Sequence, residues 1–366
     1  MTRTCRSMVF LGPGQPLELR EFALPSLRSG ELLVEVLCCT LCGSDLHTYE
    51  GHRSVECPTV LGHEILGRVA ALPDGPAVRD VEGHALDVGE TVSWSVAASC
   101  ADCFFCRRKL PQKCEQLFKY GHQPLATGHP LSGGLADFCR LAQGTAIVRV
   151  PDGLPNEVAC TANCATATVA AALRVAGDVQ NQRVVILGAG MLGLTASAMS
   201  HERGASEIIV ADVNAQRVES TRQFGATQAI DIREGSQDLR STVSDVTDRR
   251  GADVVLELSG SPDAVELGFE LLRTGGRMIL VGSVFPARPV QFSAEAIVRK
   301  LARIEGVHNY APQDLSTAIR FLAGSHLTYP FADLIEGPYR LADAEAAFRC
   351  AIDGEAFRVA VHPGMS

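Results

Sequence analysis

The sequence contains no apolar run of 18 residues and no secretory signal peptide, although residues 1–6 form a basic start. These absences predict a cytosolic protein without a membrane-spanning helix. Positive charge is not in excess either: the chain has 33 lysines and arginines and 42 aspartates and glutamates, which gives a formal net charge of −9. An acidic protein is a poor candidate for non-specific binding to nucleic acid or to an anionic membrane. We also find no internal repeat and no low-complexity segment.

The length of 366 residues predicts two domains, each with its own core. The first half is strand-like and is broken by glycine and proline into short pieces, with residues 31–39 as its clearest strand and residues 73–90 as a loop. In the second half, short apolar strands alternate with helical patterns, which indicates a parallel sheet. The expected strands are 184–187, 207–211, 253–258 and 277–281, the expected helices are 215–224 and 263–272, and the tail from about Ile304 adds a strand, a helix at 342–352 and a strand at 358–361.

Thirteen cysteines are present, an odd number in a large chain without a signal peptide, so metal ligation and reduced thiols are favoured over disulfides. Four of these cysteines fall within fifteen residues, where two-residue gaps let thiolates converge on one point. This spacing predicts a closed, structural zinc site, whereas the alternative is a set of buried small hydrophobic side chains. The predicted ligands are Cys100, Cys103, Cys106 and Cys114.

A glycine-rich motif follows the apolar residues 184–187 and opens a helix at 194–202. A G-x-G-x-x-G motif between a strand and a helix is typical of a dinucleotide site. Gly188 allows the tight turn, Gly190 lets the backbone approach a pyrophosphate, and Gly193 lets the helix pack on the strand.

The next predicted strand ends at Asp212. An acidic residue at this position accepts hydrogen bonds from the adenosine ribose hydroxyls and repels a 2′-phosphate, and no arginine follows at once. The sequence therefore favours NAD over NADP, unless Asp212 is an ordinary turn residue. Arg217 either covers the adenosine side or is a solvated helix residue.

A second metal site, with one open position, is predicted in the first half. Catalytic zinc has three protein ligands, and Cys42 and His63 offer a thiolate and an imidazole. The best candidate for the third ligand is Cys164, just before the nucleotide-binding half, with Cys160 as its competitor. Each of these residues also has a plain interpretation as a core cysteine or a turn histidine.

With these motifs in one order, the sequence resembles the zinc-dependent alcohol dehydrogenases of the medium-chain dehydrogenase/reductase superfamily over nearly its whole length. The resemblance implies an α/β protein in which a GroES-like, β-rich catalytic domain is interrupted by a Rossmann domain with a doubly wound parallel sheet. We place the catalytic domain at 1–160 and 305–366, its zinc lobe at 95–116, and the Rossmann domain at 161–304.

The resemblance also implies roles for individual residues. Two zinc ions per chain and NAD are expected, with the catalytic zinc held by Cys42, His63 and Cys164 and with Glu64 as an occasional fourth ligand. Asp45 would orient His63, and Ser44 and His47 would form the proton relay together with a cofactor ribose hydroxyl. The cofactor-binding residues implied are Gly188, Gly190, Leu192, Gly193, Asp212, Arg217, Ser283 and Arg358, the last as the cofactor-phosphate arginine.

Two positions depart from patterns within the family. Many polyol and threonine dehydrogenases have a glutamate where this chain has Cys164, and some members have a pyrophosphate-binding arginine at the position of Gly43. A narrower resemblance, carried by residues 94–121 and by the run after Asn163, is to dehydrogenases associated with bacterial phosphonate breakdown. It implies a hydroxyalkyl phosphonate as one candidate substrate.

The expected activity is zinc- and NAD-dependent, reversible oxidation of a small alcohol by a homo-oligomer, either a dimer or a tetramer. A polyol- or threonine-type dehydrogenase is the alternative substrate class. A zinc-free quinone or enone reductase and an inactive nucleotide-binding protein are the rival functions. An anionic substrate would need a cation near the metal, for which Arg53 and His122 are the candidates, although either side chain could equally be solvated.

Overall fold

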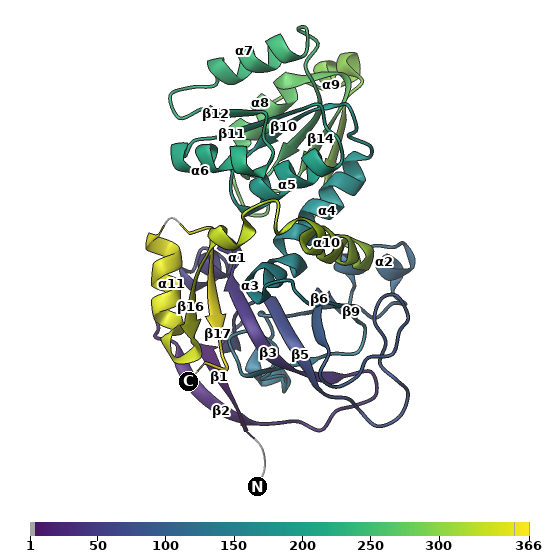
Figure 1. Cartoon of the computed structure of the whole chain (residues 1–366), viewed down its shortest axis with the longest axis vertical. Helices are drawn as coiled ribbons and strands as arrows, with labels where there is room; N and C mark the ends of the chain where they lie inside the picture. Colours follow the sequence, from purple (N-terminus) through teal and green to yellow (C-terminus); the bar gives the residue numbers. More distant parts are fainter. Residues whose placement is uncertain (1–3, 355, 366) are drawn as a thin grey trace. The chain divides into compact units, whose positions relative to one another are not determined.

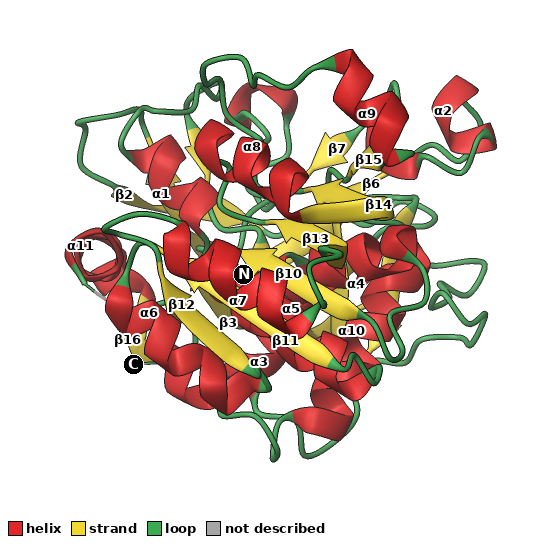
Figure 2. Ribbon diagram, turned by 90° about the horizontal axis from the view of Figure 1, so that it is seen from above, coloured by secondary structure: helices red, strands yellow, loops and turns green. Residues whose placement is uncertain are grey.

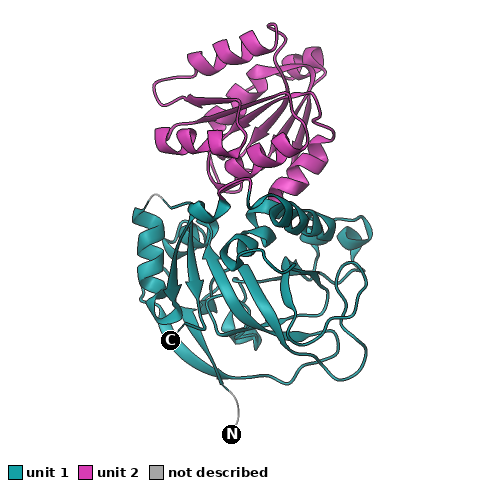
Figure 3. Ribbon diagram, viewed as in Figure 1, with its two compact units in different colours: residues 1–167, 311–327, 331–366 teal, residues 168–310, 328–330 magenta. Residues whose placement is uncertain are grey.

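The computed structural model describes residues 4–354 and 356–365, so the first three residues of the basic start lie outside the described part. The chain divides into two compact units (Figure 3). Unit 1 comprises residues 1–167, 311–327 and 331–366, and unit 2 comprises residues 168–310 and 328–330. The predicted borders at 160/161 and 304/305 therefore fall a few residues early. The second border would cut β15 (Arg303–Gly306), which is hydrogen-bonded into the sheet of unit 2.

Unit 1 is built on a sheet with the strand order β16-β17-β3-β5-β6-β7, in which Figure 1 shows β3, β5 and β6 side by side. The predicted strand at 31–39 is β3, and its side chains alternate between two cores: Leu33 and Leu41 pack on one face, and Val34 and Val36 on the other. The elements of this unit are β1 (Thr4–Phe10), β2 (Glu18–Ala23), β3 (Leu32–Leu41), α1 (Gly43–Tyr49), β4 (Thr59–Val60), β5 (Glu64–Ala71), β6 (Thr91–Ala98), α2 (Phe104–Arg107), β7 (Phe118–Lys119), β8 (Phe138–Leu141), β9 (Thr145–Arg149), α3 (Asn156–Cys160), α10 (Pro312–Ser325), β16 (Ile335–Arg340), α11 (Ala344–Asp353) and β17 (Arg358–His362).

Unit 2 is a six-stranded parallel sheet in the order β12-β11-β10-β13-β14-β15. Figure 2 shows β12, β11, β10, β13 and β14 running next to one another. The order reverses between β10 and β13, and ligands of doubly wound sheets bind beyond the carboxyl ends of the strands at such a point. The elements are β10 (Arg183–Leu187), α5 (Met191–Glu202), β11 (Glu207–Asp212), α6 (Ala215–Ser220), β12 (Gln228–Asp231), α7 (Gln237–Val246), β13 (Ala252–Glu257), α8 (Pro262–Leu271), β14 (Leu272–Leu280) and α9 (Ala294–Lys300), while α4 (Ala165–Ala176) spans the border between the units.

Helices lie on both faces of the sheet of unit 2, because alternate side chains of its central strands point to opposite faces and are apolar on both. Val185 and Leu187 of β10 share a core with residues of α7 and α8, whereas the intervening Ile186 points to the other face, toward the start of α5. Every predicted strand and helix of this half is found, with shifted ends. Helix α5, for example, starts at Met191 rather than at Leu194, so the last glycine of the motif lies inside it.

None of the described helices is by itself both long and apolar enough to cross a membrane. The segments Asn156–Asn163 and Ala165–Ala176 reach that length and composition only as a bent pair, and most of their residues are buried in the fold.

Candidate metal and dinucleotide sites

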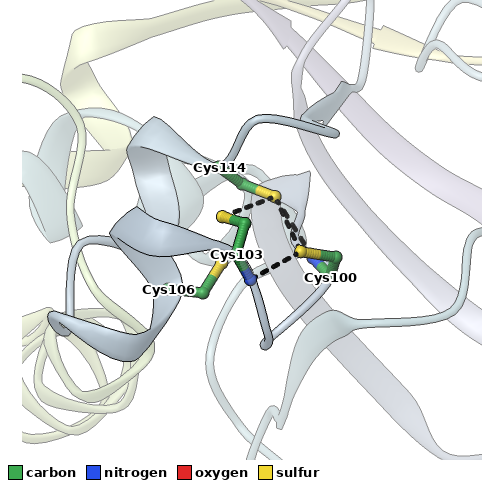
Figure 4. A group of neighbouring side chains, drawn as sticks. All are labelled: Cys100, Cys103, Cys106 and Cys114. Carbon is green, nitrogen blue, oxygen red and sulfur yellow. Dashed lines mark hydrogen bonds between the residues drawn. The ribbon is translucent and has the colours of Figure 1, made fainter.

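The four cysteines of the predicted structural site converge in a lobe of unit 1 (Figure 4). The Sγ atom of Cys114 lies 3.5 Å from that of Cys100 and 3.9 Å from that of Cys103. A tetrahedron of zinc–sulfur bonds of about 2.3 Å places its sulfurs about 3.8 Å apart, so these distances fit zinc. Backbone N–H groups of Glu115 and Cys106 lower the pKa of Cys103 to about 6, which favours the thiolate that a metal binds. The alternative of four buried hydrophobic side chains is disfavoured, because three of the four cysteines are partly exposed.

A second cluster joins Cys42, His63 and Cys164, whose ligand atoms all lie within 4.8 Å of one another. Strands β3 and β5 are antiparallel neighbours with Thr40 opposite Glu64, and this pairing brings the residues at their ends together. Cys42 follows β3 as the N-cap of α1, His63 precedes β5, and Cys164 caps a short 3₁₀ turn before α4. All three residues belong to unit 1.

Asp45 fixes the orientation of His63. Its Oδ1 lies 2.9 Å from His63 Nδ1 and its Oδ2 accepts a hydrogen bond from the backbone N–H of Cys42 at 3.0 Å, and both side chains are buried. Burial by itself would lower the pKa of His63, but the negative charges of Asp45 and Cys42 outweigh it and raise that pKa to about 10. With Nδ1 engaged, Nε2 is the nitrogen available to a metal, and the Ser44 hydroxyl lies 3.3 Å from it.

The two thiols of this cluster are coupled. A hydrogen bond from Cys164 and the positive charge of Arg358 hold the pKa of Cys42 well below its usual range, against the effect of burial. One guanidinium nitrogen of Arg358 lies 3.5 Å from Cys42 Sγ. Cys42 and Cys164 share one proton, as a thiolate and a thiol. A metal ion that binds both sulfurs would displace this proton, so the pair is already arranged as two ligands of a metal site.

Arg358 and Glu64 form a buried, two-pronged ion pair beside the cluster. Nε and Nη2 of Arg358 donate to the two carboxylate oxygens of Glu64 at 2.8 and 2.9 Å, and the side chains are 6% and 0% exposed. The structure thus places the Arg358 guanidinium against Cys42 and Glu64, both of which belong to unit 1. Its role as the cofactor-phosphate arginine, and that of Glu64 as a fourth ligand, stay predictions.

The competitor Cys160 does not join the cluster. Its thiol lies 3.3 Å from the Cys38 carbonyl oxygen and 3.2 Å from the Glu64 carbonyl oxygen, which it faces as a donor in the core. Another acidic residue of this region, Glu157, is paired with His362 at 3.0 Å. Of the two cysteines that the sequence left open, the structure therefore brings only Cys164 to Cys42 and His63.

In unit 2 the glycine motif forms a turn in which two of the three glycines, Gly188 and Gly193, leave no room for a side chain. Gly188 has a φ of 107°, and a Cβ atom on Gly193 would lie 1.9 Å from the Gly188 carbonyl oxygen. A Cβ atom on Gly190, in contrast, would meet nothing within 4 Å. The open position is the one assigned to the approach of a pyrophosphate.

Asp212 ends β11 and is held by both of its oxygens. Oδ2 accepts from the backbone N–H of Ala189 at 2.6 Å and Oδ1 from that of Asn214 at 2.8 Å. The carboxylate is thus tied to the glycine turn and borders a cavity of about 880 Å³ that Gly188, Ile232 and Phe269 also line. This size lies in the usual range for ligand pockets.

The sequence did not indicate Glu257, which organises another edge of this region. Buried at the end of β13, it accepts hydrogen bonds from Ser259 N and Oγ and from Gly260 N at 2.7–2.8 Å, and Ser283 Oγ lies 3.4 Å away. Ser283 thus helps to hold the loop after β14. An acidic residue directly before Leu258-Ser259-Gly260 was the available signal. The predicted cofactor contacts of Ser283, of Leu192 in α5 and of Arg217 in α6 remain predictions.

Comparison with known proteins agrees with this geometry. Residues 28–152 match the alcohol dehydrogenase GroES-like domain, and residues 192–324 match the zinc-binding dehydrogenase family. A sorbitol dehydrogenase from Halalkalibacterium halodurans is 30% identical over 344 residues, 93% of each chain. This chain belongs to the zinc-binding dehydrogenase family. The resemblance to medium-chain alcohol dehydrogenases, and the GroES-like domain with a Rossmann-type sheet, are thereby confirmed.

Other members of the zinc-binding dehydrogenase family are similarly close. An L-threonine 3-dehydrogenase from Pyrococcus horikoshii is 31% identical and covers 81% of this chain and 80% of its own. The crystal structure of an alcohol dehydrogenase from Thermotoga maritima superposes with a TM-score of 0.93 at 29% identity, covering 98% of this chain and 99% of its own.

Proposed function

We propose that this zinc-binding dehydrogenase oxidises the hydroxyl group of a small alcohol to an aldehyde or ketone, reversibly, with NAD and with two zinc ions per chain. The observation that carries the proposal is the convergence of Cys42, His63 and Cys164 in one unit, beside a serine hydroxyl. Two thiolates and an imidazole form a donor set that suits zinc and leaves one tetrahedral position for a substrate. A zinc-free reductase has no use for this set.

When bound, zinc acidifies a hydroxyl as a Lewis acid, and NAD accepts a hydride. The chain itself handles the proton. The Ser44 hydroxyl, next to the metal-facing Nε2 of His63, takes the proton of the alcohol and passes its own onward. His47 stands three residues later on α1, which places it on the same helical face, partly exposed, where it exchanges the proton with solvent. Thr48, bonded through its hydroxyl to the Ser44 carbonyl oxygen, anchors this turn.

The choice of NAD rests on Asp212. A carboxylate fixed by two backbone N–H groups at the end of β11 presents acceptors to two ribose hydroxyls and repels a 2′-phosphate. The cavity beside it is wide enough for an adenosine.

The relatives favour the polyol- and threonine-type alternatives as substrate class, since their names are sorbitol and L-threonine dehydrogenases. The cysteine at position 164 sets this chain apart from the glutamate-containing pattern that many such enzymes show. A hydroxyalkyl phosphonate stays a prediction from the narrower sequence resemblance.

The test is NAD reduction by purified protein of measured zinc content, followed by absorbance over a panel containing 1-propanol, 2-butanol, sorbitol, L-threonine and 2-hydroxyethylphosphonate. We expect turnover with at least one alcohol and none for Cys42→Ser. Zinc-loaded protein that reduces neither NAD nor NADP with any panel member would leave the inactive nucleotide-binding protein as the better description. Activity retained after complete removal of zinc would instead favour the zinc-free reductase.

A further inference from the structure

Two positively charged side chains stand near the proposed metal cluster without an ion-pair partner among the described residues. Lys119 ends β7 and Arg53 follows α1, and both are partly buried in unit 1. Over residues 4–354 and 356–365, neither has a carboxylate within ion-pair distance or a side-chain hydrogen bond. The sequence pointed to Arg53, whereas Lys119 emerges only from the fold.

Backbone contacts place both residues at the cluster. The backbone N–H of Arg53 bonds to the His47 carbonyl oxygen at 3.0 Å, which ties it to the end of the relay helix. On the other side, a Cβ atom on Gly121 would lie 2.9 Å from the Gly62 carbonyl oxygen and 3.2 Å from the His63 Cβ. The segment that contains Lys119 therefore packs directly against a metal ligand.

The surroundings of His122, the other candidate cation, disfavour its charged form. Burial, with Lys119 and His63 nearby, lowers its pKa well below the usual value. Its Nδ1 donates to the Tyr120 carbonyl oxygen at 2.9 Å, and its ring centre lies 5.9 Å from that of His63. A neutral ring held in this way keeps Nε2 as a hydrogen-bond acceptor beside the cluster.

Lys119 is a partly buried cation that a negatively charged ligand would stabilise. Burial and then the nearby Arg53 lower its pKa to about 8, against the attraction of Cys164, Asp45 and Cys42. Asp45, the carboxylate whose charge acts on Lys119, is already bonded to His63 and to the backbone N–H of Cys42. Two thiolates cancel the charge of a divalent ion, and Arg358 cancels that of Glu64. In a metal-loaded centre His63 is neutral, so Asp45 is the one negative charge that acts on Lys119 and Arg53, and one net positive charge is left. Partly desolvated charges of one sign are costly unless a ligand pairs with them.

We propose that Lys119 and Arg53 bind an oxyanion group of the substrate, so that the alcohol oxidised at the metal also carries a carboxylate, phosphate or phosphonate. This inference rests on the proposed function and deepens it, because it names the substrate class of the same site. Lys119 supplies a point charge and Arg53 a forked donor, and their origin on two separate segments, the end of β7 and the loop after α1, lets them hold one anion from two sides.

The test measures binding rather than turnover. Purified zinc-loaded protein is titrated calorimetrically with 4-hydroxybutanoate and with 2-hydroxyethylphosphonate, and 1-pentanol serves as the neutral comparison. We expect at least one anion to bind tighter than pentanol, by about tenfold or more, and Lys119→Gln to remove most of that difference. Lys119→Arg should restore it, and Arg53→Gln should act in the same direction as Lys119→Gln. Arg68→Gln, which changes an exposed arginine of β5, is the matched control and should change nothing.

The outcomes separate the two proposals. Anion binding that is equal in Lys119→Gln and in the parent overturns the inference, because the anion then sits on the metal or elsewhere. Pentanol binding as tightly as both anions overturns it as well. If Lys119-dependent binding is found but no alcohol is oxidised, the anion site stands and the dehydrogenase proposal fails. If neutral alcohols are oxidised but the Lys119 variants bind the anions as the parent does, the dehydrogenase proposal stands and the anion site fails.

Discussion

Among individual residues, Cys160 and Cys164 show how position decides the role of a thiol. Both are cysteines of one short segment, yet Cys160 ends α3 and points at backbone carbonyl oxygens in the core. Cys164 follows with φ −132° and ψ −78°, outside the helical region, and this break turns its thiol toward Cys42. A local change in backbone direction thus separates a packing residue from a proposed metal ligand.

Replacing Cys164 by alanine should remove the metal of the cluster, leave the metal of the lobe and abolish alcohol oxidation. Cys160→Ala should keep both metals and lose about 1 kcal/mol of stability, since only a small buried side chain is lost. Metal analysis of the two purified variants, together with their unfolding midpoints, measures both effects. If Cys160→Ala loses the metal and Cys164→Ala keeps it, the third ligand has been assigned to the wrong cysteine.

The pH dependence of anion binding should report on Lys119. Its folded-state pKa of about 8 is below the usual value, so its charge is complete well below pH 8 and is lost as the pH rises through 8. The affinity for 4-hydroxybutanoate should therefore fall above pH 8 in the parent and stay level to higher pH in Lys119→Arg, because arginine keeps its proton. Calorimetric titrations between pH 6.5 and 9.5 would show this, and identical pH profiles for the two proteins would contradict it.

At the level of elements, two glycines in the turn between β10 and α5 have different reasons to be glycine: Gly193 for packing and Gly190 for the predicted binding of a cofactor. Gly193 is needed by the fold, because a Cβ atom there collides with the Gly188 carbonyl oxygen. Gly190 has an extended backbone, φ −74° and ψ −170°, that any residue can adopt, and open space around it. Neither backbone strain nor packing requires a glycine here, which agrees with the predicted approach of a pyrophosphate.

Gly190→Ala should accordingly lose no more than about 1 kcal/mol of stability, the effect of alanine at the N-cap of α5, but bind NAD at least about tenfold more weakly, since the methyl group occupies the path of the pyrophosphate. Gly193→Ala should lose roughly 1–3 kcal/mol of stability, because backbone must shift to relieve the contact. Thermal unfolding and calorimetric NAD titration of the two variants test the distinction. Full NAD affinity in Gly190→Ala would show that the pyrophosphate does not pass this position.

The cysteine lobe is a second part of the fold whose local structure leads to a prediction. Its helix α2 and the 3₁₀ turn Pro111–Lys113 contain no buried residue, so the lobe has little apolar core of its own. We therefore predict that a bound metal contributes to the stability of the lobe.

Cys103→Ser should lower the zinc content by one ion per chain and make the lobe sensitive to trypsin at Arg107 and Lys109. Cys57→Ser, which alters a cysteine outside both clusters, is the control. Mass spectrometry of the digests locates the cuts. A Cys103→Ser lobe that resists trypsin as well as the parent does would argue against a metal-dependent fold.

For the whole molecule, the sheet of unit 2 brings the motif glycines and Asp212 to the carboxyl ends of adjacent strands β10 and β11. NAD should be preferred to NADP by at least about tenfold in kcat/KM, or about 1.4 kcal/mol, because the fixed carboxylate repels a 2′-phosphate. Asp212→Ser should reduce that preference. Steady-state rates with both cofactors decide the matter, and equal use of the two by the parent protein would contradict the assignment. The homo-oligomeric state and the cytoplasmic location also stay predictions.

The sequence alone determined what depends on short-range spacing. The four cysteines of the lobe, the glycine turn with Asp212, and the strand–helix alternation of the second half follow from local geometry, so they could be predicted and the structure shows them. The exact domain borders could not be predicted, because the strand signal near Ile304 does not tell which sheet the strand joins, and β15 joins that of unit 2 by pairing with β14.

Only the tertiary structure decided the contacts between segments distant in sequence. The choice of Cys164 over Cys160, the pairing of Arg358 with Glu64, and the approach of Lys119 to Cys42 depend on which strands lie next to each other. The physical reason is that charge and burial act through space. In the sequence Lys119 looks like an ordinary solvated lysine, but in the fold it is a partly desolvated cation near the proposed metal ligands, and none of its neighbours along the chain indicates this.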